Sequence, residues 1–367
     1  MMTKFSRLLN GYINEIGLSD SRLAWRIGVC RHTIIRWRKG LVEHPNCDRV
    51  RDVANVLRLA PQERHELLRA AMCQDRTADQ FLPVIGKPVF SPKQFFGREE
   101  LLGRIKRAWE KDSLENVAVI GNRGSGKTSL LHYLEKIGTT SKNSLRPNQR
   151  PPKGWKDWLP KDFQFAIIDF SDAGMCDPEV LVREVLQQLK LPTPEVCDLE
   201  CFAKTLKQVE IPTIIMMDEV GAGLNSETLT PEFWYNLRSL AGHSPHLGFL
   251  MTARESVQVL AKNAGKPSPF FNLFGHTLEL EAFTDDEAQD FLNNFPGKLS
   301  SKDRQWILDN SGRWPVFLQM ICDERLIALE EKQLDELWKV EALKRIKTFQ
   351  ESSSRPISIK NTSEVWQ

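Results

Sequence analysis

Apolar positions follow two different spacings along the chain, and the change of spacing divides it into predicted regions. Residues 1–75 and 283–350 show the three-to-four spacing of amphipathic helices, whereas residues 96–282 alternate short apolar runs with helical segments. That alternation is typical of a buried parallel sheet. We expect a helical N-terminal domain at 1–75, a linker at 76–95, an α/β core at 96–282, a helical lid at 283–350 and a disordered tail at 351–367.

The first region contains three short predicted helices. They span residues 5–16, 22–27 and 31–39, and a tight turn at Gly28 separates the second from the third. Two short helices joined by a glycine turn favour a helix-turn-helix. The predicted core of this domain consists of Leu23, Ala24, Ile27, Val29, Ile34 and Trp37.

The central region contains four continuous apolar runs, and a fifth follows them. The predicted strands lie near residues 116–121, 163–170, 212–218, 247–252 and 277–280. Helical segments separate them, so we expect a parallel sheet of the α/β class.

A glycine-rich turn follows the first strand. Gly121, Gly126, Lys127 and Thr128 match the phosphate-binding pattern G-x-x-x-x-G-K-[ST] between a predicted strand and a predicted helix. Glycine lets successive backbone N–H groups curl round phosphate oxygens, and the helix directs its positive end at them. Lys127 is expected to reach the β- and γ-phosphates of ATP, and Thr128 to ligate Mg²⁺. The predicted cofactor-binding residues here are Gly121, Asn122, Arg123, Gly124, Ser125, Gly126, Lys127, Thr128 and Ser129.

The strand before residue 219 ends in two carboxylates, as in a Walker B motif. Asp218 is expected to hold the magnesium ion, directly or through water, and Glu219 to orient and deprotonate the attacking water. The alternative is a core strand that ends in a solvated acidic turn.

Composition indicates an ordinary globular protein. Hydrophobic residues make up 41% and charged residues 27% of the chain, and no apolar run approaches the roughly 20 residues that cross a bilayer. The N-terminus lacks a signal-peptide pattern, so we expect a cytoplasmic protein without a membrane partner. The seven cysteines are scattered without a C-x-x-C pair, which predicts reduced thiols and no structural metal.

Charge is unevenly distributed. Residues 1–80 contain 14 Lys and Arg against 9 Asp and Glu, while the remainder contains 36 against 39. The basic surplus of the N-terminal region indicates nucleic acid as a partner. A second basic stretch, at 138–162, either holds a nucleic-acid strand by charge and stacking or is a solvated loop. Its basic and aromatic residues are Lys142, Arg146, Arg150, Lys153, Trp155, Lys156, Trp158 and Lys161.

The N-terminal string Leu23-Ala24…Ile27-Gly28-Val29…Thr33-Ile34…Trp37…Gly40 resembles the lambda-repressor/Cro-like helix-turn-helix family over about residues 5–72. The resemblance implies that the third helix enters the DNA major groove. The alternative is a domain that docks a protein. The predicted DNA-binding residues are Arg31, His32, Thr33, Ile35, Arg36, Arg38 and Lys39.

Residues 95–330 resemble the STAND-type signalling ATPases and related AAA+ proteins. The resemblance rests on Phe96-Gly97-Arg98-Glu99, the phosphate loop, Walker B, a strand ending in Thr252-x-Arg254, and a Gly-x-Pro-like element that ends at Pro315. It implies that Thr252 and Pro315 approach the nucleotide and that Arg254 contacts the γ-phosphate. With Lys127, Asp218 and Glu219, Arg254 completes the predicted catalytic set.

Together these patterns predict an ATP-binding and ATP-hydrolysing DNA-binding regulator. Nucleotide state would set conformation or homo-oligomer assembly and thereby control how the helix-turn-helix engages DNA. Two other functions stay open at this point: a transposition-type AAA+ ATPase that assembles on DNA without sequence preference, and an adaptor ATPase whose N-terminal domain docks a protein.

Overall fold

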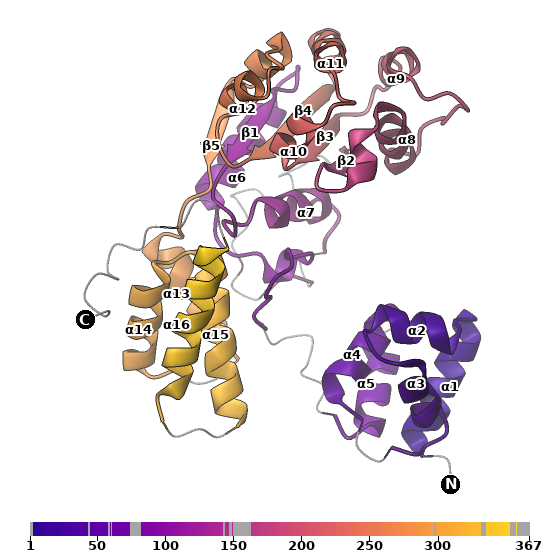
Figure 1. Ribbon diagram of the computed structural model, residues 1–367, viewed down its shortest axis with the longest axis vertical. Helices are drawn as coiled ribbons and strands as arrows, with labels where there is room; N and C mark the ends of the chain where they lie inside the picture. Colours follow the sequence, from indigo (N-terminus) through magenta and orange to yellow (C-terminus); the bar gives the residue numbers. More distant parts are fainter. Residues whose placement is uncertain are drawn as a thin grey trace. The chain divides into compact units, whose positions relative to one another are not determined.

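The chain folds into two compact units, Met1–Gln80 and Phe81–Gln367. The structure is a computed structural model, and it describes residues 3–42, 45–57, 59, 61–73, 82–141, 144–146, 149, 163–296, 299–331, 335–352 and 357. Figure 1 labels the helices and strands of both units.

The described residues of the first unit form helices joined by turns and irregular segments, and they include no strand. Its helices are α1 (Lys4–Ile16), α2 (Asp20–Arg26), α3 (Arg31–Arg38), α4 (Cys47–Val56) and α5 (Pro61–Ala70). They surround one small core, and of the six core residues that the sequence predicts, all are buried except Val29. Val29 is partly buried and packs against the edge of that core.

The turn between α2 and α3 depends on a glycine in the left-handed region. Gly28 has a φ of +67°, and the N–H of Val29 returns to the carbonyl of Ala24 at 2.9 Å, which closes the end of α2. Arg38 then fixes α3 from its other end, because its guanidinium forms an ion pair with Asp20 at 2.5 Å. The two helices are therefore held at a defined angle by local backbone and side-chain contacts.

One prediction about the cysteines is wrong. Cys47, the first residue of α4, and Cys73, which follows α5, form a disulfide rather than two reduced thiols. Sequence spacing did not reveal the pair because 26 residues separate them and two helices bring them together. A bridge over this separation removes chain entropy from the unfolded state and stabilises the unit by about 3–4 kcal/mol.

The second unit contains a five-stranded parallel sheet in the order β2-β3-β4-β1-β5. The strands are β1 (Val117–Ile120), β2 (Gln164–Asp169), β3 (Thr213–Asp218), β4 (Leu247–Ala253) and β5 (His276–Glu279). The five strands predicted from apolar runs are all present in the sheet. β4 lies between β1 and β3, so chain segments that are distant in sequence end side by side.

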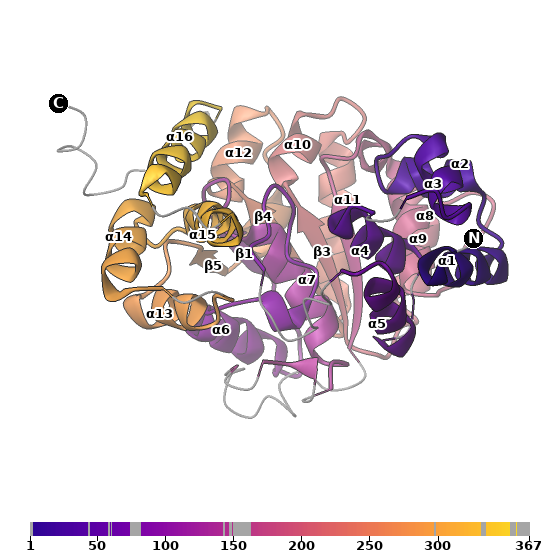
Figure 2. The same ribbon diagram turned by 90° about the horizontal axis from the view of Figure 1, so that it is seen from below.

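Helices cover both faces of this sheet (Figure 2). One face packs against α6 (Glu99–Trp109) and α7 (Lys127–Ile137), and consecutive strand residues alternate between the faces. In β3, for example, Ile214 and Met216 point to the α7 side, while Ile215 and Met217 point to the other side. The helices of that other side are α8 (Pro178–Gln188), α9 (Leu199–Leu206), α10 (Val220–Asn225), α11 (Pro231–His243) and α12 (Val257–Asn263).

A helical lid follows the sheet and has a core of its own. Its helices are α13 (Asp285–Asn293), α14 (Ser301–Ser311), α15 (Pro315–Glu330) and α16 (Leu337–Glu351), drawn in orange to yellow in Figure 1. Thr284 and Glu287 form a capping box at the start of α13. Phe291, Phe317, Ile321 and Ala342 are fully buried between the helices.

Two expected boundaries differ in the structure. Residues 82–95 of the expected linker belong to unit 2 and pack within it. The N–H of Val89 donates to Ser129 Oγ at 3.0 Å, and that of Val84 to Gln319 Oε1 at 2.9 Å. At the other end, residue 351 completes α16, and Ile357 is buried in the lid core. Apolar residues in these segments pack against other parts of the unit, and their irregular spacing along the chain does not predict this packing.

Across the described ranges, the helices are all too short or too polar to cross a membrane.

Candidate nucleotide-binding site

The phosphate-binding loop, the P-loop, connects β1 to α7 over residues 121–126. Gly124 has a φ of +80° and Gly126 a φ of +101°, a region that side chains with a Cβ rarely adopt. A Cβ at Gly124 would lie 2.7 Å from the side chain of Val316 in the lid. Glycine is therefore required at this position for its backbone conformation and also because it has no Cβ. The backbone of the loop therefore continues directly into the N-terminus of α7, which starts at Lys127.

Lys127 is buried at this point, with 5% of its surface exposed. Its Nζ donates hydrogen bonds to the carbonyls of Gly121 at 3.0 Å and Asn122 at 3.4 Å, and lies 3.7 Å from Glu219. Burial lowers the pKa of Lys127, while Glu219 and Asp218 oppose that effect. A buried ammonium that is held mainly by weak carbonyl contacts gains more binding free energy from a phosphate anion than a solvated lysine does.

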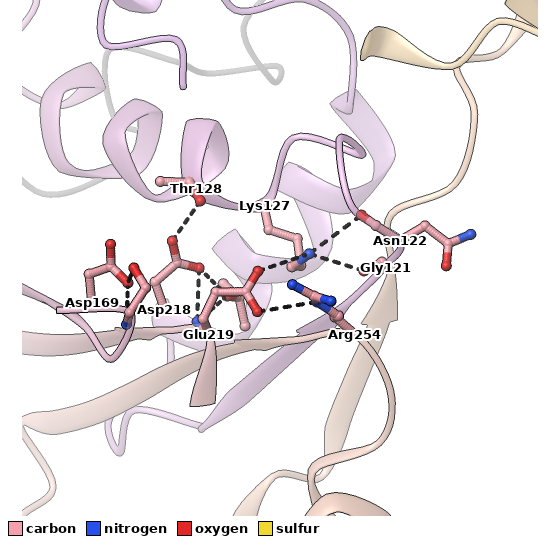
Figure 3. A network of polar contacts seen from close by, with 10 residues as sticks. Gly121, Asn122, Lys127, Thr128, Asp169, Asp218, Glu219 and Arg254 are labelled. Atoms are coloured by element: carbon pink, nitrogen blue, oxygen red, sulfur yellow. Dashed lines mark hydrogen bonds and ion pairs between the residues drawn. The ribbon is translucent and has the colours of Figure 1, made fainter. Parts of the chain in front are cut away.

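Asp218 lies at the carboxyl end of β3, between two hydroxyl groups (Figure 3). Thr128 donates to its Oδ2 at 2.6 Å, and Thr252 of β4 donates to its Oδ1. Asp218 and Thr128 thus present adjacent oxygen donors beside the P-loop, a set that suits Mg²⁺, which takes few protein oxygens and completes its shell with water and phosphate. Thr252 is fully buried, so it orients Asp218 and has no surface from which to touch a nucleotide.

Glu219 follows Asp218 in a left-handed backbone conformation, with a φ of +49°. Its N–H donates to Thr252 Oγ1 at 3.2 Å, which fixes the turn. The carboxylate then lies between two cations, 3.7 Å from Lys127 and 3.6 Å from Arg254. Strained backbone of this kind is stable only when its neighbours enforce it, and here it turns the carboxylate toward the P-loop.

A cavity of about 390 Å³ extends from the P-loop toward the lid. P-loop residues and apolar side chains both line it, and we refer to it as the P-loop cavity. Its apolar lining residues are Val84, Ile85, Val89, Phe95, Phe96, Phe283, Phe291, Pro315, Val316, Met320 and Phe349. Pro315, which the resemblance leads us to expect near a nucleotide, is the first residue of α15 and belongs to this lining. A cavity lined by a buried cation and by apolar side chains suits a nucleotide.

The remaining P-loop residues have separate partners. Ser129 accepts a hydrogen bond from Val89, and Arg123 points away from the phosphate-binding turn toward the end of α16. The predicted residues Lys127, Thr128, Asp218, Glu219 and Arg254 come together at one edge of the sheet, whereas Arg123 and Ser129 hold surrounding elements in place.

The residues predicted to contact DNA lie on α3 of the first unit and at its C-cap, and they form three groups. Arg31, His32, Arg36 and Lys39 are exposed. The Arg38 side chain is bonded within the first unit, because it donates to Asn10 and Asn14 on α1 and to Asp20 on α2. Thr33 and Ile35 are half-buried. Exposed Arg22 and Arg26 on α2 extend the basic surface. The sequence pattern does not single them out, because each occupies an ordinary solvated position of an amphipathic helix.

Arg146, expected in a solvated or nucleic-acid-binding loop, is buried. Its guanidinium lies 3.6 Å from the centre of the Phe96 ring, donates to the carbonyls of Lys93 and Phe95, and lies 3.5 Å from Asp290. Burial lowers its pKa to about 10. The other residues of that stretch, Lys142, Arg150, Lys153, Trp155, Lys156, Trp158 and Lys161, lie outside the described residues.

Arg98 belongs to the Phe96-Gly97-Arg98-Glu99 string, which the resemblance leads us to expect near the adenine base. It is 8% exposed and donates to the carbonyls of Ser125 in the P-loop, at 3.1 Å, and of Glu281, at 2.7 Å. Its backbone N–H donates to Glu287 of α13. Only the folded chain shows that this arginine joins the P-loop to the lid.

Comparison with solved structures gives the second unit a known architecture. Matches include a Walker-type ATPase of Pyrococcus abyssi (16% identity, 72% of this chain and 75% of that chain covered, TM-score 0.52). Another is the ORC2 protein of Aeropyrum pernix in its ADPNP–ADP complexes (15% identity, 74% and 72% covered, TM-score 0.51). No family model matches the sequence, and no curated protein does.

The second unit shares its fold with these two proteins, a parallel α/β sheet with helices on both faces. The strand order explains the site: β4 is inserted between the P-loop strand β1 and the acidic strand β3. That insertion sets Thr252 beside Asp218 and Arg254 beside Glu219.

Proposed function

We propose that this chain binds and hydrolyses ATP with Mg²⁺ and is a DNA-binding regulator whose nucleotide state controls DNA engagement by the first unit. The observation that carries the ATPase proposal is the meeting of Lys127, Thr128, Asp218 and Glu219 at the carboxyl ends of β1 and β3. These groups supply a phosphate-binding cation, a metal-binding pair and a base at one place. The ORC2 neighbour, solved with ADPNP and ADP, supports nucleotide as the ligand of this fold.

Each residue then has a role that follows from its contacts. Lys127 exchanges the carbonyls of Gly121 and Asn122 for the β- and γ-phosphates. Thr128 and Asp218 would hold Mg²⁺, which would supply positive charge against the phosphates. Glu219 accepts a proton from the attacking water, and Arg254 stabilises negative charge at the γ-phosphate.

Removing the P-loop cation tests nucleotide binding. Lys127→Ala should weaken ATP binding by about 10- to 100-fold or more, because at least one strong charge-assisted contact is lost. Lys136→Ala is the matched control, since Lys136 lies on the same helix and its Nζ contacts the carbonyl and the ring of Phe90, away from the P-loop glycines. Isothermal titration calorimetry with ATP measures both variants. Equal ATP affinity in parent and Lys127→Ala protein would contradict the site.

We further propose that the first unit is a helix-turn-helix domain that binds DNA through α3. Support comes from the two short helices joined at Gly28, the exposed cations of α2 and α3, and the basic surplus of residues 1–80. In such domains the N-terminal residues of the second helix read base edges, and the first helix crosses the phosphate backbone.

Arg36→Ala should cost about 1–3 kcal/mol on the preferred DNA site and relax discrimination there, because a guanidinium can pair with guanine in two places. Lys39→Ala should instead weaken all sequences alike. Arg69→Ala on α5 removes the same charge from another exposed position of the same unit and is the matched control. Fluorescence anisotropy at two salt concentrations measures all three. If the unchanged protein binds no DNA at low salt, a protein-docking adaptor replaces the DNA-binding proposal; filaments on random DNA would favour a transposition-type ATPase.

A further inference from the structure

The Cys47–Cys73 bridge joins the start of α4 to the chain that follows α5. Cys73 belongs to the core of the first unit, and the half-buried Cys47 packs against that core from outside. The bridge therefore lies at the edge of the core. A Cys47 thiolate would lie at the positive end of α4, which stabilises the thiolate and favours thiol–disulfide exchange.

The segment that Cys73 holds has a backbone conformation that needs support. Met72, between α5 and Cys73, is exposed and has a φ of +56° although it is not glycine. The N–H of Cys73 returns to the carbonyl of Leu68 at 2.9 Å and closes the end of α5. A residue with a Cβ keeps a left-handed conformation only where its surroundings enforce it. Opening of the bridge should therefore loosen the end of α5.

The other end of the bridge lies two residues before a side chain that holds the turn between α2 and α3. From the first turn of α4, Arg49 donates to the carbonyl of Ile27 at 2.7 Å. Its Nη1 lies 3.6 Å from the position that a Cβ on Gly28 would occupy. Asn46 accepts the N–H of Arg49 at 3.1 Å, so the same helical turn carries Cys47 and this guanidinium. Arg49 thus links the bridge to the turn that orients α3.

The remainder of α3 and α4 is anchored without the bridge. Val50, Val53 and Ala54 of α4 are buried in the core. Ile34 and Trp37 bury one face of α3 in the same core. Loss of the bridge should therefore displace the first turn of α4 and the α2–α3 turn, while the core of the first unit stays folded.

We propose that the Cys47–Cys73 bridge is a redox switch that sets the affinity of the first unit for DNA. The inference rests on the proposed DNA-binding function of α3. In the oxidised form the bridge holds the first turn of α4, and Arg49 holds the α2–α3 turn in the arrangement described above.

A dithiol reductant opens the bridge by thiol–disulfide exchange. The S–S bond breaks, Cys47 and Cys73 take up two electrons and two protons as thiols, and the reductant becomes a disulfide. Oxidised glutathione reverses the reaction and is itself reduced to two thiols. The reduced form lacks the constraint on the first turn of α4, so the contact of Arg49 with Ile27 is made less often.

The test measures DNA affinity of the full-length protein by fluorescence anisotropy after treatment with oxidised glutathione or with dithiothreitol. Reduction should weaken DNA binding by about 10-fold, because the arrangement of α3 that fits DNA becomes less populated when a charged hydrogen bond to the turn is lost. Reduction should also lower the Tm of the first unit by about 10 °C or more. Alkylation with a maleimide, followed by mass spectrometry, reports whether Cys47 and Cys73 are thiols.

Three kinds of variant identify the path of the effect. Cys47→Ser and Cys73→Ser should bind DNA like the reduced parent protein and should not respond to dithiothreitol. Cys30→Ser removes the exposed free thiol before α3 and is the control that should keep the response. Arg49→Ala should bind weakly in both redox states. An arginine that only contacted a DNA phosphate would also weaken binding when replaced, but the response to dithiothreitol would remain.

Equal DNA affinity of the oxidised and the reduced parent protein would overturn the switch. Alkylation of both Cys47 and Cys73 after treatment with oxidised glutathione would overturn it as well. A response that persists in Arg49→Ala would show that the bridge does not act through the α2–α3 turn. If the oxidised parent protein binds no DNA at low salt, the proposed DNA-binding function itself fails, so the two failures are distinguishable.

Discussion

Glu219→Gln should reduce ATP turnover by about 10²- to 10⁴-fold while ATP binding stays at least as tight as in the parent protein. The amide keeps the shape of the side chain but cannot accept a proton from water. Because turnover and binding respond differently, the variant separates the base from the phosphate-binding groups.

The geometry of the site explains why binding should not suffer. The Glu219 carboxylate lies 3.7 Å from Lys127 and 3.6 Å from Arg254, the two cations that the phosphates also need. A neutral amide competes less for these cations than a carboxylate does. The amide also leaves the Asp218 contacts with Thr128 and Thr252 in place, so the metal-binding pair is unchanged.

Glu279→Gln provides the matched control. Glu279 ends β5 at the same edge of the sheet and is exposed, but it is not part of the contacts around Lys127 and Asp218. Phosphate release measures turnover, and equilibrium titration with ATP measures binding, in all three proteins. Normal turnover in Glu219→Gln would show that another group activates the water.

ATP should raise the affinity of the full-length protein for DNA by about 10²- to 10⁴-fold if it promotes assembly of the second unit. One copy of the first unit makes few phosphate contacts and should bind weakly alone. Assembly tethers several copies, so later contacts become intramolecular without any new base contact. Linkage requires that DNA tighten ATP binding by the same factor.

The test of this coupling is the DNA affinity of the full-length protein. It is measured at one fixed salt concentration with ATP, with ADP and without nucleotide. Arg254→Ala should abolish the difference between the nucleotide states, because Arg254 lies at the proposed γ-phosphate position beside Glu219. It should leave the nucleotide-free DNA affinity unchanged. The same DNA affinity in all three states of the parent protein would indicate two independent modules on one chain.

Much of the candidate site is local in sequence and could be predicted for that reason. A P-loop is a continuous run of backbone, so the glycines before Lys127 and Thr128 specify its conformation by themselves. The strand ending at Asp218 is likewise one apolar run followed by two carboxylates. The parallel α/β class follows from strands that alternate with helical segments.

The sequence determined the five strands, the first three helices and the glycine turns, because hydrophobic spacing and backbone freedom act over a few neighbouring residues. Only the tertiary structure decided which elements meet. The placement of β4 between β1 and β3, the burial of Arg146 and the Cys47–Cys73 bridge all join distant segments. Periodicity shows that a helix has an apolar face but does not identify what covers it, so the contact of Arg123 with Phe349 exists only once the lid packs on the P-loop.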